Sequence, residues 1–132
     1  MIKTIPLTAL QTAIFKCLKQ GQTVSIYGDV PTKAKLPYIT IGVIVAKPYS
    51  VKDVNLWEAS INIDVWATKE DKKWVNETLT DICYIITYLD TRIPIEGYAF
   101  NSVSIETVEA FAAEGGGYHG TVTINCELQE TR

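Results

Sequence analysis

The stretch that decides the fold spans residues 57–89 and reads WEASINIDVWATKEDKKWVNETLTDICYIITYL. In its first third, apolar residues alternate with polar ones. The apolar set is Trp57, Ala59, Ile61, Ile63 and Val65, and the polar set is Glu58, Ser60, Asn62 and Asp64. This period of two is typical of a β-strand with one buried face. We therefore expect a strand over residues 57–65, with one face toward a core and the other toward water or a partner.

An amphipathic helix is expected directly after this strand. Thr68 precedes Asp71 by three residues, the spacing of a capping box, in which two side chains satisfy backbone N–H groups of the first helical turn. Apolar residues then recur at steps of four and three, namely Val75, Leu79, Ile82, Ile86 and Leu89. This stripe is expected to lie on the inner face of the strand.

Composition and charge limit the function classes. A chain of 132 residues with 47% hydrophobic content fits one domain over residues 1–132, with a core that needs no disulfide or metal. The net charge of -3 and the pI near 5.1 argue against a protein whose main task is to grip a phosphate backbone. We therefore expect no tight binding of nucleic acid.

The cysteines and the hydropathy pattern point to a reducing compartment. Cys17, Cys83 and Cys126 are far apart and lack the close pairs of a zinc site, so we expect reduced core thiols and no metal or cofactor. The start of the sequence does not resemble a signal peptide, and no apolar run reaches the ~20 residues that span a bilayer. These features predict a protein made in a cytoplasm, with no membrane partner.

The first half of the chain predicts a helix and two strands before residue 57. Helical spacing from Leu7 to Leu18 predicts a helix that starts near Pro6 and ends at Gly21. A short strand is expected over residues 24–27. Residues 37–46 are apolar at nearly every position, which predicts a strand covered on both faces, either central in the sheet or crossing an interface. Residues 47–55 are expected to form a projecting loop.

The second half predicts a hairpin. Residues 98–111 show a less regular strand pattern, and residues 112–117, with three consecutive glycines, are expected to form a flexible tip. The last strand alternates from Tyr118 to Leu128. The expected order is α-β-β-β-α-β-β. This order predicts an α+β fold, with a mainly antiparallel sheet and two helices packed on one face.

His119 is the single histidine and the main candidate for chemistry. As a general base it would need a carboxylate partner, for which Glu114 or Glu106 are the nearest candidates across the hairpin. The sequence has no nucleophile elbow, however, and a histidine beside a turn is more often solvated or hydrogen-bonded at an interface. The glycines of residues 115–121 superficially resemble a phosphate loop, but the loop lacks its lysine and precedes a strand. We therefore expect no catalytic residue and no enzyme.

Two tryptophans lie near the junction of the predicted strand and helix. Trp66 and Trp74 are expected to brace the helix against the sheet. The alternative is that one of them is exposed and anchors a subunit interface, where tryptophan is enriched.

Five short motifs occur in an order and spacing that resemble one family. They are LQTAIF at residues 10–15, VSIYG at 24–28, LPYITIG at 36–42, IDVW at 63–66 and HG at 119–120. Together they resemble the small tail completion proteins of long-tailed bacteriophages. These proteins are also called tail terminator or head–tail joining proteins, and are related in fold to the tail terminator of phage lambda.

The resemblance implies a structural virion protein that is assembled in the bacterial cytoplasm. Its subunits would form a homohexameric ring at the head-proximal end of the tail tube, stop tube polymerisation and join the tail to the head connector or stopper protein. DNA would pass through an acidic lumen without tight binding. Candidate interface residues lie in and around the two expected loops: Lys47, Tyr49, Lys52, Asp53, Trp66, Glu114, Gly116, Tyr118 and His119. Another neck or connector adaptor, and an enzyme or ligand-binding domain that uses His119, remain as alternatives.

Overall fold

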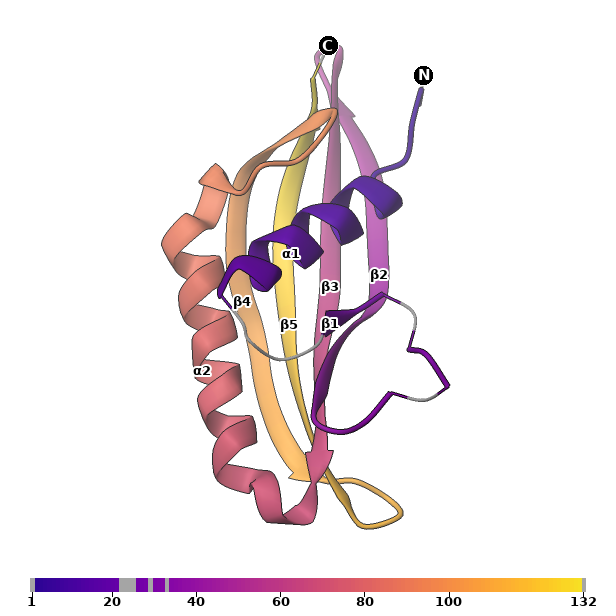
Figure 1. Cartoon of the computed structure of the whole chain (residues 1–132). Coiled ribbons are helices and arrows are strands. Elements are labelled where there is room, and N and C mark those ends of the chain that lie inside the picture. Colours follow the sequence, from indigo (N-terminus) through magenta and orange to yellow (C-terminus); the bar gives the residue numbers. More distant parts are fainter. Residues whose placement is uncertain (1, 22–25, 29, 33, 132) are drawn as a thin grey trace.

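The computed structural model describes residues 2–21, 26–28, 30–32 and 34–131. Two helices and five strands follow in the expected order, α-β-β-β-α-β-β (Figure 1). They are α1 (Leu7–Gly21), β1 (Ile26–Tyr27), β2 (Tyr38–Val51), β3 (Val54–Thr68), α2 (Lys72–Leu89), β4 (Tyr98–Ala112) and β5 (Gly117–Glu130). Short 3-10 turns, η1 (Lys69–Asp71) and η2 (Asp90–Arg92), flank α2. The predicted α+β class is therefore confirmed.

The five strands form one sheet in the order β1-β2-β3-β5-β4. β1 pairs with β2 in parallel, and the other three pairings are antiparallel. β3 and β5 are central, and they pair without a register shift from Leu56 opposite Gln129 to Thr68 opposite Gly117. The stretch that decides the fold thus supplies one of the two middle strands.

The core lies between one face of this sheet and the two helices. The alternating residues Trp57, Ala59, Ile61, Ile63 and Val65 are all buried, as predicted. Val75, Leu79, Ile82 and Ile86 of α2 are buried too, which places the predicted stripe on the same core. α1 crosses this face obliquely and α2 runs along β4 and β5 (Figure 1). We call this side the helix-bearing face and the opposite side, which carries Asp64, Trp66 and His119, the open face.

The start of α2 differs from the predicted capping box. The Thr68 hydroxyl donates a hydrogen bond of 2.8 Å to the Asp71 carboxylate instead of accepting one from the helix backbone. The three residues of η1 stand between the strand and the α-helix, so the side chains bond to each other across a tight turn. The helix is entered through a 3-10 turn, which is common at helix ends.

The strand over residues 37–46 is not central, contrary to one of the two expectations. β1 pairs only with Ile39 and Thr40 of β2, and beyond them no described strand pairs with the outer edge of β2. Val43 and Val45 are 65% and 47% exposed. A bulge between Ile41 and Ile44 turns these side chains away from the core. The apolar run reflects an exposed edge, so the second expectation, that the strand crosses an interface, stays a prediction.

The prediction of a projecting loop over residues 47–55 is wrong. β2 and β3 continue as a paired hairpin through Lys47 opposite Glu58 to Val51 opposite Val54. Only Lys52 and Asp53 form the turn, and both have positive φ, at 46° and 70°. Pro48 and the polar residues around it mask the strand pattern. A proline is tolerated here because β2 has a free edge that needs no N–H donor.

The remaining boundaries are close to the predictions. α1 begins at Leu7, and Gly21 is its last residue, not the residue after it. β1 begins at Ile26, whereas residues 24 and 25 of the expected strand lie outside the described residues. The tip between β4 and β5 is confirmed, with Gly115 and Gly116 at φ 85° and 94°.

Candidate interaction surfaces

The subunit has two hairpin tips at opposite ends of the sheet (Figure 1). Lys52 and Asp53 form the tip between β2 and β3, and Glu114 and Gly116 lie in the tip between β4 and β5. β3 spans 15 residues between these ends, on the order of 50 Å at ~3.4 Å per residue. The structure therefore divides the predicted interface residues into two distant groups. Trp66, Tyr118 and His119 lie toward the second tip, whereas Lys47 and Tyr49 lie on the strand next to the first.

An aromatic cluster occupies the open face near the tip between β4 and β5. The Trp66 and His119 rings stack with centroids 3.8 Å apart and an interplanar angle of 17°. Phe111 lies 4.9 Å from the His119 ring. These contacts follow from register, because Trp66, His119 and Phe111 are directly opposite one another on β3, β5 and β4. Trp66 Nε1 donates a hydrogen bond of 3.0 Å to Thr40 Oγ1 on β2, so the cluster spans four strands.

Trp66 does not brace α2 against the sheet, contrary to the expectation. It projects from the open face, whereas α2 covers the helix-bearing face, because successive residues of a strand point to opposite sides. Trp74 does pack against the core, as expected, and Trp57 is buried in it. Trp66 is partly exposed, which leaves its proposed interface role as a prediction.

The carboxylate that meets His119 is Asp64, not Glu114 or Glu106. His119 Nε2 lies 3.0 Å from Asp64 Oδ1, and the two side chains are 15% and 18% exposed. Sequence patterning had no means of finding this pair, since the residues are 55 positions apart and lie on neighbouring strands, diagonal to each other. A histidine base with an orienting acid supplies two of the three residues of a catalytic triad. Here, however, the ring stacks on Trp66 and lies against the tilted ring of Phe111, which is the packing of a structural histidine.

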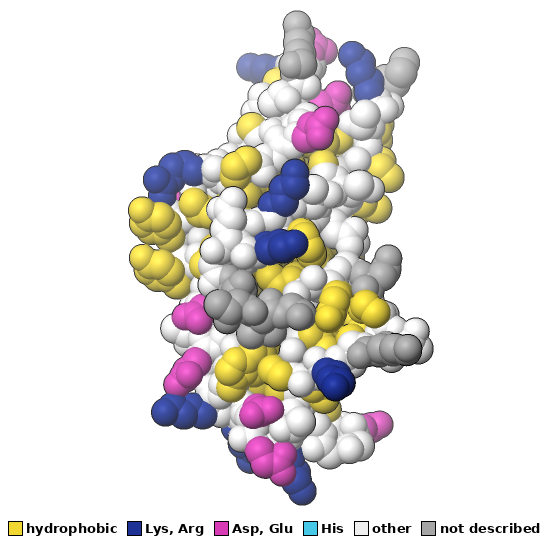
Figure 2. All heavy atoms as spheres, in the orientation of Figure 1, with side chains coloured by type: hydrophobic (Ala, Val, Ile, Leu, Met, Phe, Trp, Pro, Cys, Tyr) yellow, Lys and Arg dark blue, Asp and Glu magenta, His cyan; other side chains and the backbone are white. Residues whose placement is uncertain are grey.

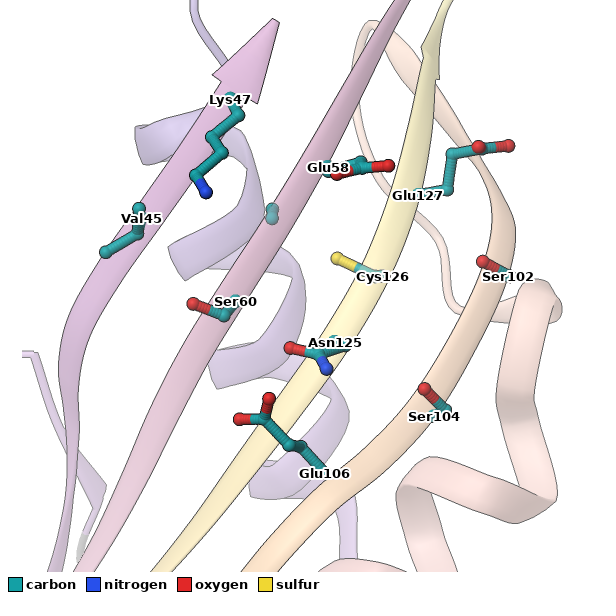
Figure 3. Close-up of a pocket in the computed structure, with 11 residues that line it drawn as sticks. Val45, Lys47, Glu58, Ser60, Ser102, Ser104, Glu106, Asn125, Cys126 and Glu127 are labelled. Carbon is teal, nitrogen blue, oxygen red and sulfur yellow. The ribbon is translucent and has the colours of Figure 1, made fainter.

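A shallow groove of about 410 Å³ crosses the open face farther along the sheet (Figure 3). Its charged lining residues are Glu58, Glu106 and Glu127, against a single Lys47. Ser60, Ser102, Ser104 and Asn125 supply the uncharged polar lining. This part of the open face is acidic and hydrophilic. On the helix-bearing face, basic and acidic side chains are interspersed, and neither kind gathers into one patch among the described residues (Figure 2).

Tyr49 connects the edge of the open face to this groove. Its hydroxyl donates a short hydrogen bond to the Glu127 carboxylate, which also accepts one of 3.0 Å from the Asn101 amide. The bond to Glu127 raises the pKa of Tyr49 to about 12, and the bonds from Tyr49 and Asn101 hold the pKa of Glu127 below its ordinary value. Tyr49, predicted as a loop residue, is thus part of a cross-strand polar network.

The described part of the chain offers few groups for metal or thiol chemistry. It contains no group of three or more His, Cys, Asp or Glu residues that could hold a metal ion. All three thiols are free; Cys17 and Cys126 are buried, and Cys83 is partly buried. Burial raises the pKa of Cys17 to about 11 and that of Cys126 to about 12. Neither of the described α-helices combines the length and the apolar content that a membrane-spanning helix needs.

Two surface features were missed by the sequence patterns. Tyr84 and Tyr88 are 65% and 60% exposed on α2 and stack with centroids 5.7 Å apart. The Arg92 guanidinium lies 5.1 Å from the Tyr88 ring. The spacing of four residues between Tyr84 and Tyr88 could have indicated this stacked pair, because residues i and i+4 lie on one side of a helix. The second missed feature is the free edge of β2, which depends on strand order and leaves no local signal.

The described residues thus present two hairpin tips, an aromatic cluster and an acidic groove as their main surface features. The family described as tail completion protein gp17 matches residues 9–126, and the chain belongs to this family. The protein is therefore a structural component of a bacteriophage tail and of the virion, and not an enzyme. The family resemblance inferred from the sequence is confirmed.

A solved structure shares the fold. It is a chain from the virion of a native gene transfer agent particle, with a TM-score of 0.75 and 14% sequence identity. The similarity covers 93% of this chain and 96% of that chain. No curated protein matches the sequence.

Proposed function

We propose that this protein forms a ring, with six subunits as the family resemblance implies, at the head-proximal end of the phage tail tube. The ring stops polymerisation of the tube and offers the surface that joins the tail to the head connector or stopper protein. The observation that carries the proposal is a subunit of a tail completion family with two hairpin tips at opposite ends of one long sheet.

Opposite tips suit a subunit that must bind two different partners. In a ring whose axis is inclined to the strands, as in a closed sheet, one set of tips meets the tail tube and the other meets the connector. The two tips differ in chemistry, which suits distinct partners. The tip at Lys52 and Asp53 is a tight, charged turn, whereas the tip at Glu114, Gly115 and Gly116 is glycine-rich.

The acidic groove suits the wall of a DNA channel. With three carboxylates and one lysine, the groove repels a phosphate backbone, so DNA passes without lasting contacts. In the proposed ring, the open face therefore lies toward the lumen and the helices lie toward the outside.

The first experiment is electron microscopy of tail tubes incubated with the protein carrying a gold-labelled C-terminal tag. Thr131 lies beside Asp53 and Lys3, so such a label marks the end of the subunit at the tip between β2 and β3. We expect label at one end of each tube only, in a ring of tube width. Label along the tube, or on heads alone, would contradict tail termination and favour another neck component.

Charge reversal at each tip then separates the two partners. Asp53→Lys alters the first tip and Glu114→Lys the second, and Asp81→Lys on the exposed side of α2 is the matched control. We expect one tip variant to lose capping of tubes and the other to cap tubes but lose joining to heads, with the control active in both assays. If both tip variants matched the control, the tips would not be the contact sites.

A further inference from the structure

Within the described part of the chain, most of β2 and all of β4 leave one strand edge unpaired. Beyond Ile39 and Thr40, the outer edge of β2 faces no described strand, and the same holds for the outer edge of β4. The bulge between Ile41 and Ile44 interrupts β2, and Pro48 has no N–H to donate, so the regular part of β2 that can accept a strand is residues 44–47. On β4, a bulge between Ile105 and Thr107 leaves residues 107–112 as a regular segment that is exposed at each position. Four residues of each segment can therefore pair.

Before Lys47 and Pro48, the free edge of β2 carries none of the residues that normally protect a strand edge. Residues 38–46 read YITIGVIVA, without a charge or a proline. Lysine, proline and inward charges are the usual protection against pairing with another chain. A run of high β propensity with an exposed edge and apolar side chains is an aggregation hazard unless something covers it. Val43 and Val45 are the exposed side chains of this run. The edge therefore has the properties of a docking site.

The strand directions identify an occupant. Three successive antiparallel pairings separate β2 from β4, so β4 runs antiparallel to β2. A second copy whose strands run in the same directions, shifted along the strands relative to the first, brings its β4 against the free edge of β2 in the antiparallel sense. This contact uses different surfaces on the two copies, so it repeats and closes into a ring if the rotation allows. The alternative, β2 against β2, closes at a dimer.

The side chains favour one register. Val45 and Lys47 pair with Ser60 and Glu58, and so lie on the open face. Phe111 and Glu109 pair with His119 and Thr121, and so lie on the open face as well. In an antiparallel pair, opposite residues share a face, so Val45 opposite Phe111 places Lys47 opposite Glu109. This register joins an apolar pair to a pair of opposite charge, and it sets Ala46 against Ala110 on the other face.

We infer that residues 44–47 of β2 bind residues 109–112 of β4 in a second copy of this chain, antiparallel, with Lys47 opposite Glu109 and Val45 opposite Phe111. The contact extends the aromatic cluster of one subunit with a valine from the next and continues the sheet between subunits. The choice of β4 over a second β2 rests on the proposed ring.

Disulfide trapping tests the register. In a Cys83→Ser background, Val45→Cys is placed in one set of chains and Phe111→Cys in another, and the two are mixed on tail tubes and, separately, at high concentration in solution. Opposite residues have Cβ atoms about 4.5–5.5 Å apart, close enough for a disulfide after small adjustments. We expect cross-linked dimers from the 45 and 111 mixture. Val51→Cys mixed with Phe111→Cys is the control and should give none, since Val51 is also exposed but lies at the far end of β2.

Charge reversal tests the same contact without a cross-link. We expect Lys47→Glu and Glu109→Lys each to weaken association roughly tenfold in sedimentation velocity. The double variant, with both charges exchanged, should recover most of the lost association. Circular dichroism of each variant shows whether the monomer is folded. Association that the exchange does not restore would contradict the pairing.

The outcomes separate this inference from the proposed function. Label at one tube end without the 45 to 111 cross-link, on tubes or in solution, would overturn the edge pairing and leave tail termination standing. The cross-link in solution without label on tube ends would support the edge pairing and overturn tail termination. A cross-link between two Val45→Cys chains would replace the ring contact with a β2 dimer.

Discussion

His119 Nε2 lies 3.0 Å from Asp64 Oδ1 while the His119 ring stacks on Trp66, so the single histidine of the chain is held by one hydrogen bond and one aromatic face. We expect His119→Ala to lower the free energy of unfolding by about 1–2 kcal/mol, because both contacts are lost. His119→Phe keeps a ring against Trp66 and should lose less. Urea denaturation measures both values. Equal stability of His119→Ala and the parent protein would show that the cluster does not support the fold.

The bond between Tyr49 and Glu127 predicts two pH dependences of opposite sign. The pKa of Glu127 is lowered in the folded chain, so its contribution is present above the ordinary carboxylate pKa and is lost as pH falls through the lowered value. The pKa of Tyr49 is raised from 10 to about 12, so its contribution is present below pH 10 and is lost as pH rises toward 12. Tyr49→Phe should flatten both limbs of a plot of stability against pH. Tyr84→Phe, at another exposed tyrosine, should leave both limbs unchanged.

The alternating stretches predicted much of the fold because their signal is local. Residues 57–65 alternate because one side chain in two meets the helices, and a period of two is visible without knowing the partner strand. The position of β2 at the edge is a matter of strand order, which is nonlocal. Its apolar run is equally typical of a buried strand and of an exposed edge that awaits a partner.

The candidate surfaces were harder to predict than the elements. Asp64 meets His119 only because β3 and β5 pair in one particular register, and no spacing in the sequence encodes that register. Glu114 and Glu106 were nearer in sequence, yet Glu114 lies in the tip and Glu106 lines the groove. In the stretch of residues 47–55, Pro48 and its polar neighbours hid a hairpin that becomes evident only from its pairing with β3.

Substitutions in the turn between β2 and β3 should increase the stability of the fold. Lys52 and Asp53 have φ of 46° and 70°, a left-handed conformation that favours asparagine and glycine. We expect Lys52→Asn with Asp53→Gly to raise the free energy of unfolding by about 0.5–1 kcal/mol, because the strain of positive φ is removed. Lys47→Asn, within the strand, is the control and should not stabilise. Thermal denaturation checks both, and a loss of stability in the turn variant would contradict the assigned turn.

The close approach of α2 to β5 depends on Gly120. A Cβ atom at this position would lie 2.9 Å from Leu79 Cδ1 and 2.9 Å from Val75 Cγ1. We expect Gly120→Ala to lower the free energy of unfolding by about 1–3 kcal/mol, because the helix must shift. Combined with Leu79→Ala, the loss should be smaller than the sum of the two single losses, since the shortened side chain makes room. Additive losses in a denaturation cycle would contradict direct contact at this position.

The three thiols are expected to react at different rates. Thiolates are the reactive form, and burial raises the pKa of Cys17 to about 11, that of Cys126 to about 12 and that of Cys83 as well. Cys17 and Cys126 are only 5% and 6% exposed, whereas Cys83 is partly exposed and lines a shallow groove beside Val108 and Glu109 of β4. Iodoacetamide should therefore modify Cys83 first in the native protein, and the other two at least roughly tenfold more slowly. Mass spectrometry of the modified peptides measures the order, and Cys83→Ser should abolish the fast reaction. If β4 pairs with β2 of a second copy, assembly should also slow the modification of Cys83. Equal rates for Cys83 and Cys126 would contradict the burial of Cys126 beneath the sheet.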